Sequence, residues 1–252
     1  MSAISYDFSD KTVLLVGGTS GIGLAAAKLF TEAGASVTIA GPDQKQGQEV
    51  AAGLAGHVQF CLLDVRDEAG VSRVVQNVVE RHGRLDIAVN NAGVEGPFGA
   101  VEEMSGEDYQ RVLDINLKGI WHGMKYQIRQ MRAQGGGVIV NTGSSASLCA
   151  IPQVAVYSAS KHALAGLTKA AALEQARNNI RINAVAPGPV RTGLLDRMVG
   201  GHISLDDIAD RVPMGRIADP REVATAIAWL VSDGASFVTG HILSIDGGMT
   251  VA

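Results

Sequence analysis

The stretch of sequence that decides the fold is Thr12–Val16 (TVLLV), followed by the turn Gly17-Gly18-Thr19-Ser20-Gly21-Ile22-Gly23. The run Thr12–Val16 is too short for a helix and rich in branched side chains, which predicts a buried strand. A helical pattern runs on from the turn through residues 22–32. Glycines between a strand and a helix allow a tight turn and let a pyrophosphate approach the helix N-terminus. A turn without any ligand is the alternative for a glycine cluster taken alone.

The same alternation of short apolar runs and longer amphipathic stretches continues along the chain. Further strands are predicted at residues 37–40, 58–62, 87–89, 138–141, 182–185 and 242–245. Helices are predicted at residues 22–32, 68–82, 106–133, 154–177 and 220–232. This pattern predicts an α/β fold, a doubly wound parallel sheet of about seven strands with helices on both faces. We expect one domain over residues 1–252, with the irregular segment 188–215 as a substrate lid.

Composition narrows the function classes. An apolar fraction of 46% and a charged fraction of 18% are ordinary for a globular protein. The net charge of −4 and the lack of a basic stripe argue against nucleic-acid binding. We expect no signal peptide and no membrane span, because no suitable apolar run occurs. Cys61 and Cys149 form no disulfide framework, which favours the cytoplasm, and the histidines lack metal-ligand spacing, so no metal is expected.

The residues after the second and third strands bear on the adenosine end of a dinucleotide. An acidic side chain there would hold the ribose hydroxyls of NAD, whereas an arginine would hold the extra phosphate of NADP. The second strand ends in Gly41-Pro42-Asp43, without an arginine. Asp43 is a candidate for the ribose and equally for the cap of a helix beginning near Gln44. Asp64 is a candidate for the adenine amino group or for a helix cap. The balance favours NAD over NADP, but Lys45 leaves the choice open.

Tyr157 and Lys161 are four residues apart in a helical stretch and therefore share one helix face. Reduction of a carbonyl by hydride needs a proton donor, and the reverse reaction needs a base. A free tyrosine titrates near pH 10, and a nearby ammonium favours its phenolate. Ser144 follows a predicted strand at the sheet edge where α/β proteins bind ligands, and its hydroxyl can hold a substrate oxygen. Ser145 and Ser147 are neighbouring alternatives that the sequence does not rank.

In these motifs the chain resembles the short-chain dehydrogenase/reductase family, of the Tyr-x-x-x-Lys type, from about residue 8 to residue 249. The glycine turn matches the family's T-G-x-x-x-G-x-G, except that Val16 replaces the threonine. Asn90-Asn91-Ala92-Gly93 matches its N-N-A-G, and Pro187-Gly188 with Thr192 matches its nicotinamide segment. The tetrad matches Asn116, Ser144, Tyr157 and Lys161.

The resemblance implies a Rossmann-type domain that binds NAD or NADP. It implies Tyr157 as general acid/base, Lys161 as the residue that lowers the Tyr157 pKa, Ser144 on the substrate oxygen and Asn116 on a relay water. From the residues and the resemblance together, the expected cofactor contacts are Gly17, Thr19, Ser20, Gly21, Ile22, Gly23, Asp43, Asp64, Val65, Asn90, Ala92, Gly93, Tyr157, Lys161, Pro187, Gly188, Val190 and Thr192.

A mostly apolar set of residues is expected to line the substrate pocket: Ser144, Glu95, Cys149, Val154, Leu194, Leu195 and Met198. It predicts a neutral alcohol or ketone of modest size. Glu95 either selects a polar substrate group or faces solvent. The resemblance also implies a homotetramer built on the helical stretches 106–133 and 154–177.

Three alternatives remain open at the level of sequence. A 3-oxoacyl-carrier-protein reductase would need a basic docking patch, for which Arg129 and Arg132 are the candidates. A non-catalytic, cofactor-binding regulator would be expected to lack the tetrad. An epimerase or dehydratase would be expected to carry a longer C-terminal substrate region.

Overall fold

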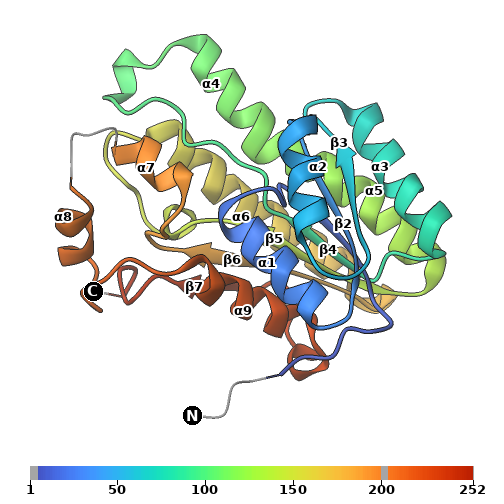
Figure 1. Ribbon diagram of the computed structural model, residues 1–252. Coiled ribbons are helices and arrows are strands. Elements are labelled where there is room, and N and C mark those ends of the chain that lie inside the picture. Colours follow the sequence, from blue (N-terminus) through green and yellow to red (C-terminus); the bar gives the residue numbers. More distant parts are fainter. Residues whose placement is uncertain (1–4, 200–203, 252) are drawn as a thin grey trace.

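The computed structural model describes residues 5–199 and 204–251, and a seven-stranded sheet runs through its centre (Figure 1). The strands lie in the order β3-β2-β1-β4-β5-β6-β7, and every neighbouring pair is parallel. Their bounds are Thr12–Val16 (β1), Ser36–Gly41 (β2), Val58–Leu62 (β3), Ile87–Asn90 (β4), Gly137–Thr142 (β5), Ile180–Pro187 (β6) and Ile242–Ile245 (β7). The prediction of a parallel α/β sheet is therefore confirmed. The strand order reverses between β1 and β4, the place where such sheets bind ligands.

Helices cover both faces of the sheet. Helices α1 (Gly21–Glu32) and α9 (Pro220–Val231) lie side by side on one face (Figure 1), and α3 (Glu68–His82), α5 (Gly119–Gln134) and α6 (Ala155–Gln175) cover the other. Strand side chains alternate between the two cores: Leu15 packs with α1 and α9, and Leu14 with the α3–α5–α6 layer. Because both faces are buried, the strands read as continuous apolar runs.

Shorter elements join these layers. They are α2 (Gln44–Gly53), η1 (Val101–Glu103), α4 (Gly106–Leu113), η2 (Asp114–Lys118), η3 (Ser145–Ser147), η4 (Ala176–Asn178), α7 (Gly193–Val199), α8 (Leu205–Asp210) and η5 (Asp233–Ala235). The expectation of one continuous helix over residues 106–133 was wrong in one respect. The turn η2 is a π-helix between α4 and α5, and it carries Asn116. Apolar periodicity does not register such a widened turn, which is common at functional sites.

The segment 188–215 is more regular than its sequence suggests. It contains α7 and α8, which lie to one side of the sheet at its β6–β7 end (Figure 1). Residues 200–203, which belong to the predicted lid, lie outside the described residues. None of the helices within 5–199 and 204–251 is both long and apolar enough to cross a membrane.

Candidate active site

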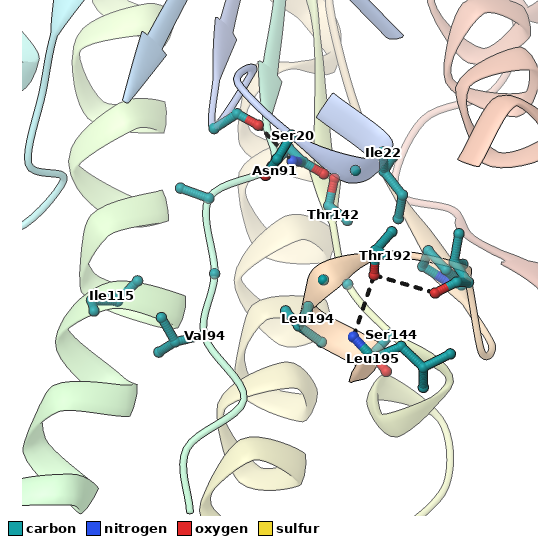
Figure 2. A pocket seen from close by; sticks show the side chains of 18 of the residues that line it. Ser20, Ile22, Asn91, Val94, Ile115, Thr142, Ser144, Thr192, Leu194 and Leu195 are labelled. Atoms are coloured by element: carbon teal, nitrogen blue, oxygen red, sulfur yellow. Dashed lines mark hydrogen bonds between the residues drawn. The ribbon is translucent and has the colours of Figure 1, made fainter. Parts of the chain in front are cut away.

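A cavity of about 770 Å³ opens at the carboxyl ends of the strands. Residues that end six neighbouring strands or directly follow them form its wall: Val16 and Gly17, Ala40 and Gly41, Leu63 and Asp64, Asn91 to Gly93, Thr142 to Ser144, and Pro187 and Gly188. One helix end and one short helix complete the wall, since Ser20 and Ile22 come from α1 and Leu194 and Leu195 from α7 (Figure 2). The parallel sheet thus gathers distant parts of the sequence at one edge.

The glycine turn lies close against the loop after β4. Gly17 has a positive φ of 82°, and a Cβ there would lie 2.6 Å from the backbone nitrogen of Ala92. The Asn91 amide nitrogen donates to the Gly17 carbonyl at 2.8 Å (Figure 2). This hydrogen bond ties the turn after β1 to the loop after β4. Gly23 does not line the cavity, but a Cβ there would lie 2.0 Å from the Gly17 oxygen.

The N-terminus of α1 is open toward the cavity. Ser20, the N-cap residue, makes no side-chain capping hydrogen bond, and the first turn carries no acidic residue. Ser20, Gly21 and Ile22 all line the cavity. Backbone N–H groups and the helix dipole at such an end suit an anion.

The adenosine end of the cavity differs from expectation at Asp43. Its carboxylate accepts from the Gln46 backbone nitrogen at 2.9 Å, so it caps α2, and it does not line the cavity. Asp64 and Val65 do line it, as does Arg66, which sequence reasoning missed. Arg66 binds the Asp64 carboxylate, with Nη2 2.6 Å from Oδ2, and holds the pKa of that carboxyl low. Arg66 stands two residues after Asp64, just past β3, and this spacing is the sequence signal that could have identified it.

Tyr157, Lys161 and Ser144 meet in the cavity wall, and all three are buried. Tyr157 and Lys161 lie one turn apart on α6. The Lys161 ammonium donates to the Thr142 carbonyl at 2.9 Å and lies 5.6 Å from the centre of the Tyr157 ring. Ser144 stands two residues after the end of β5 as the N-cap of η3, where its Oγ accepts from the Ala146 nitrogen at 3.1 Å.

Burial dominates the proton affinities of this group. Burial raises the pKa of Tyr157, the Ser144 hydroxyl lowers it, and the Glu95 carboxylate raises it. Burial also lowers the pKa of Lys161 to about 8. In the protein alone, burial raises the pKa of Tyr157, contrary to the lowering expected from Lys161, because a low-dielectric interior disfavours both charges.

Asn116 is fully buried behind the cavity wall. Its Oδ1 accepts from the Val94 nitrogen and its Nδ2 donates to the Val94 oxygen, both at 2.8 Å, while Nδ2 also lies 3.2 Å from the Ser160 hydroxyl. Its side chain therefore fixes the backbone that follows β4. Asn90 likewise lies behind the wall, where Nδ2 donates to Gln127 at 3.0 Å. Neither asparagine lines the cavity.

The nicotinamide segment and the substrate end lie along β6 and α7. Pro187, Gly188, Val190 and Thr192 line the cavity as expected, with Leu194, Leu195 and Met198. The Thr192 hydroxyl donates to the Val190 carbonyl at 3.2 Å and accepts from the Leu195 nitrogen at 3.4 Å (Figure 2).

Three expected substrate contacts lie outside the cavity lining. Val154 packs against Tyr157, Cys149 is exposed, and Glu95 pairs with Arg197. Lining residues that sequence reasoning missed include Ile115, Ile151, Arg197 and Met249. They come from the π-turn, the loop before α6, α7 and the C-terminal turn, whose meeting depends on tertiary structure.

Comparisons with known proteins agree with this geometry. A family model described as "Enoyl-(Acyl carrier protein) reductase" matches residues 16–250. An uncharacterized oxidoreductase of Thermotoga maritima is 42% identical, and the match covers 97% of this chain and 99% of that protein. A 2,5-dichloro-2,5-cyclohexadiene-1,4-diol dehydrogenase of Sphingobium indicum is 39% identical, over 97% and 98%. A cyclohexanol dehydrogenase of an Acinetobacter species is 38% identical, over 98% of each.

Solved structures match over nearly the whole chain as well. A levodione reductase superposes with a TM-score of 0.94 at 34% identity, over 97% of this chain and 99% of that one. A 3-ketoacyl-(acyl-carrier-protein) reductase from Brucella melitensis, solved with NADH, gives 0.91 at 31%, over 96% and 98%. ElxO with NADP bound gives 0.91 at 35%, over 96% and 99%.

The chain belongs to the short-chain dehydrogenase/reductase family. As a short-chain dehydrogenase/reductase, it is an NAD(P)-dependent oxidoreductase.

The cavity fits the nicotinamide cofactor that this family uses. The glycine cradle and the open end of α1 suit its pyrophosphate. Deeper in the cavity, the Thr142 hydroxyl is buried without a hydrogen-bond partner among the described residues. A buried polar group without a partner is costly, so a polar ligand atom would stabilise it. No group of three His, Cys, Asp or Glu side chains within 5–199 and 204–251 is arranged to hold a metal ion.

Proposed function

We propose that this chain interconverts a neutral cyclic secondary alcohol, about the size of a six-membered ring, and its ketone. Tyr157 is the general acid/base of this reaction. One observation carries the proposal: Tyr157, Ser144 and Lys161 converge in one cavity wall, between the glycine cradle and the apolar residues of α7. A bound nicotinamide supplies or accepts the hydride. The protein must then move one proton to or from the substrate oxygen.

Each polar side chain has a distinct part in the proposal. Ser144 donates a hydrogen bond to the substrate oxygen and stabilises the charge that develops there. Tyr157 gives its phenolic proton to that oxygen during reduction and takes it back during oxidation. The Lys161 ammonium, anchored on the Thr142 carbonyl, favours the phenolate when it forms. Asn116 fixes the backbone of the cavity wall at Val94, and we propose that it also holds a water of the proton relay.

The substrate end of the cavity supports a neutral, mainly hydrocarbon substrate. Its side chains are largely apolar, among them Val94, Ile151, Leu195 and Met198. Relatives whose names refer to ring alcohols or ring ketones, the cyclohexanol dehydrogenase and the levodione reductase among them, agree with that size and polarity.

NAD is proposed ahead of NADP. Gly41 ends β2 and Pro42 follows it; both line the cavity, and neither side chain carries a charge for a phosphate. The nearest guanidinium at the adenosine end, on Arg66, is already engaged by Asp64.

The test is a panel of cyclic and open-chain secondary alcohols and ketones, each assayed with NAD(H) and NADP(H) by the absorbance of the reduced nicotinamide. We expect the highest kcat/KM for a six-membered ring substrate with NAD(H), and a loss of turnover in Tyr157→Phe. Wild-type turnover in that variant would exclude Tyr157 as the acid/base. Failure to bind either cofactor by calorimetry would exclude the reaction.

Reduction of a 3-oxoacyl thioester on a carrier protein is the second candidate, favoured by the likeness to the Brucella melitensis reductase. Arg129 and Arg132 of α5 are the proposed contacts for an acidic carrier. Arg129 stacks on Tyr126, with its guanidinium carbon 5.4 Å from the ring centre. Turnover of a 3-oxoacyl thioester that exceeds turnover of every ring ketone would favour this candidate.

A homotetramer and a cytoplasmic location complete the proposal. Leu173 of α6 is 81% exposed and Trp121 of α5 is 43% exposed. A hollow is lined by Leu113 of α4, Leu117 of η2, Trp121 of α5 and Leu167 of α6. Exposed apolar surface of this kind marks an interaction site. Both cysteines are free, which suits a reducing compartment.

A further inference from the structure

An ion pair joins the two walls of the substrate end. Arg197 of α7 meets Glu95, which follows β4 and is 102 residues away in sequence. Arg197 Nε lies 2.7 Å from Oε1 and Nη2 lies 3.3 Å from Oε2. This two-point geometry is the strong form of an arginine–carboxylate contact. The Glu95 side chain is only 15% exposed, whereas that of Arg197 is 61% exposed and lines the cavity.

The two partners are anchored differently. Glu95 is adjacent to Val94, whose backbone nitrogen and oxygen both bond the buried Asn116 side chain. The Glu95 side of the pair is therefore fixed to the core. Arg197 belongs to a helix of seven residues, α7, whose Leu194, Leu195 and Met198 face the substrate end. A short helix has little stability of its own and depends on tertiary contacts.

We propose that Glu95 and Arg197 form an ionic clasp that positions α7 over the substrate end of the cavity and balances the negative charge of Glu95 beside Tyr157. The clasp rests on the proposed function, because it acts on the substrate and the proton donor of that reaction. Both residues are positioning residues: Arg197 acts through Glu95, and Glu95 acts through α7 and through its field at Tyr157.

The electrostatic part follows from the charges around Tyr157. The Glu95 carboxylate raises the pKa of Tyr157, and its bond to Arg197 places a compensating positive charge beside it. The other charged or titratable groups on the elements around Tyr157 have their own contacts. Lys161 bonds Thr142, Cys149 bonds Ser145, and Asp114 of η2 pairs with Lys118. On α7, the Asp196 carboxylate also raises the pKa of Arg197, after the hydrogen bond to Glu95, and so favours its charged form.

Opposite shifts in two single variants test the clasp. Glu95→Gln removes the negative charge, so the pH midpoint for alcohol oxidation should move down. Arg197→Gln leaves Glu95 uncompensated, so the midpoint should move up, and the double variant should lie between the two. KM should rise about two- to fivefold in both single variants, the range for a partly exposed ion pair. Arg197→Lys keeps the positive charge but loses the two-point contact with Glu95. It should therefore keep the wild-type pH midpoint, with a KM between those of the wild type and Arg197→Gln.

Arg73→Gln is the matched control, because it breaks an exposed pair with Asp67 on α3, away from the cavity. It should leave KM and the midpoint unchanged. Hydrogen exchange in the cofactor-free protein gives a second readout: the α7 peptide should exchange faster in Glu95→Gln and Arg197→Gln than in wild type or Arg73→Gln. Circular dichroism checks that each variant is folded.

The outcomes separate the clasp from the reaction. Unchanged KM, midpoint and α7 exchange in both single variants would overturn the clasp, while loss of turnover in Tyr157→Phe would still support the reaction. Shifts in the same direction would overturn the charge-balancing part. If the wild-type protein turns over no alcohol or ketone, the proposed function fails, and unchanged α7 exchange would then also reject the positioning part.

Discussion

At the scale of single residues, burial sets the proton affinities of Tyr157 and Lys161. Both are buried, and the interior disfavours the charged form of each. Tyr157 therefore remains a phenol over the neutral range, ready to protonate an alkoxide. Lys161 loses its proton at a much lower pH than a free lysine. The site is consequently built as a proton donor at neutral pH, and it becomes a base only when the pH rises.

The two directions of the reaction should depend on pH in opposite ways. Carbonyl reduction needs the phenol, so kcat/KM should stay level from about pH 6 to the pKa of Lys161, about 8, and fall above it as the ammonium is lost. Alcohol oxidation needs the phenolate, so its kcat/KM should rise with pH through and beyond neutrality. Initial rates of ketone reduction and of oxidation of the corresponding alcohol, measured across this pH range, give both pH dependences. If kcat/KM for reduction already begins to decline below neutral pH as the pH is raised, that result would contradict a raised Tyr157 pKa.

Thr142→Val should affect stability and cofactor binding in opposite directions. Among the described residues the Thr142 hydroxyl is buried without a partner, so its removal should raise the free energy of unfolding of the cofactor-free protein by about 1 kcal/mol. If a cofactor atom satisfies this hydroxyl, affinity should fall by about fivefold or more. Thermal melting and calorimetry measure the two effects. Thr38→Val is the control, since the Thr38 hydroxyl is also buried without a partner among the described residues but lies outside the cavity lining. The control should change stability alone, and a drop in stability without a change in affinity in Thr142→Val would reject the assignment.

At the scale of elements, the glycine turn and α1 form one unit whose spacing depends on Gly23. Its Cα lies so close to the Gly17 carbonyl that an added Cβ would lie 2.0 Å from that oxygen and 2.8 Å from the Asn91 amide nitrogen. The same Asn91 nitrogen bonds the Gly17 carbonyl and so ties the turn to the loop after β4. A side chain at Gly23 would push α1 away from both.

Gly23→Ala should therefore destabilise the protein by about 1–3 kcal/mol, the usual cost of overpacking, and weaken binding of the reduced cofactor. Gly53→Ala is the control, because a Cβ on Gly53 of α2 meets no atom of the described part of the chain within 4 Å. The control should be neutral or slightly stabilising. Urea unfolding and fluorescence titration with NADH give the two numbers. Equal stability of the two variants would show that α1 can shift without cost.

The sequence predicted the elements well where a local pattern determines them. Buried strands such as Thr12–Val16 keep their bounds because a run of five residues rich in branched side chains is too short for a helix. It did not predict the π-turn at Asn116, because one widened turn leaves apolar periodicity almost unchanged. It could not decide between ribose binding and helix capping for Asp43, since both need a carboxylate at the same place. Glu95 and Arg197 lie 102 residues apart, and nothing local in the sequence relates them.

At the scale of the whole molecule, the parallel sheet explains why the site could nevertheless be located. The carboxyl ends of β1, β4, β5 and β6 meet at one edge, so motifs that directly follow strands must lie together. The glycine turn, Gly93, Ser144 and Gly188 were placed in this way. The residues that were missed, such as Ile151 and Met249, come from loops whose paths depend on packing across the whole molecule.

The exposed apolar surface of α5 and α6 leads to a prediction about assembly. Leu173 and Trp121 are large and exposed, yet burial of such side chains in an interface contributes about 1.5–3 kcal/mol each. Leu173→Asp combined with Trp121→Ser should therefore dissociate the proposed tetramer into smaller species by sedimentation velocity. Leu62→Ser is the control, because Leu62 is 56% exposed but ends β3 at the opposite edge of the sheet. The control should sediment as wild type. A wild-type protein that sediments as a monomer at micromolar concentration would reject the tetramer, and the active site, lined within one chain, would then be expected to work alone.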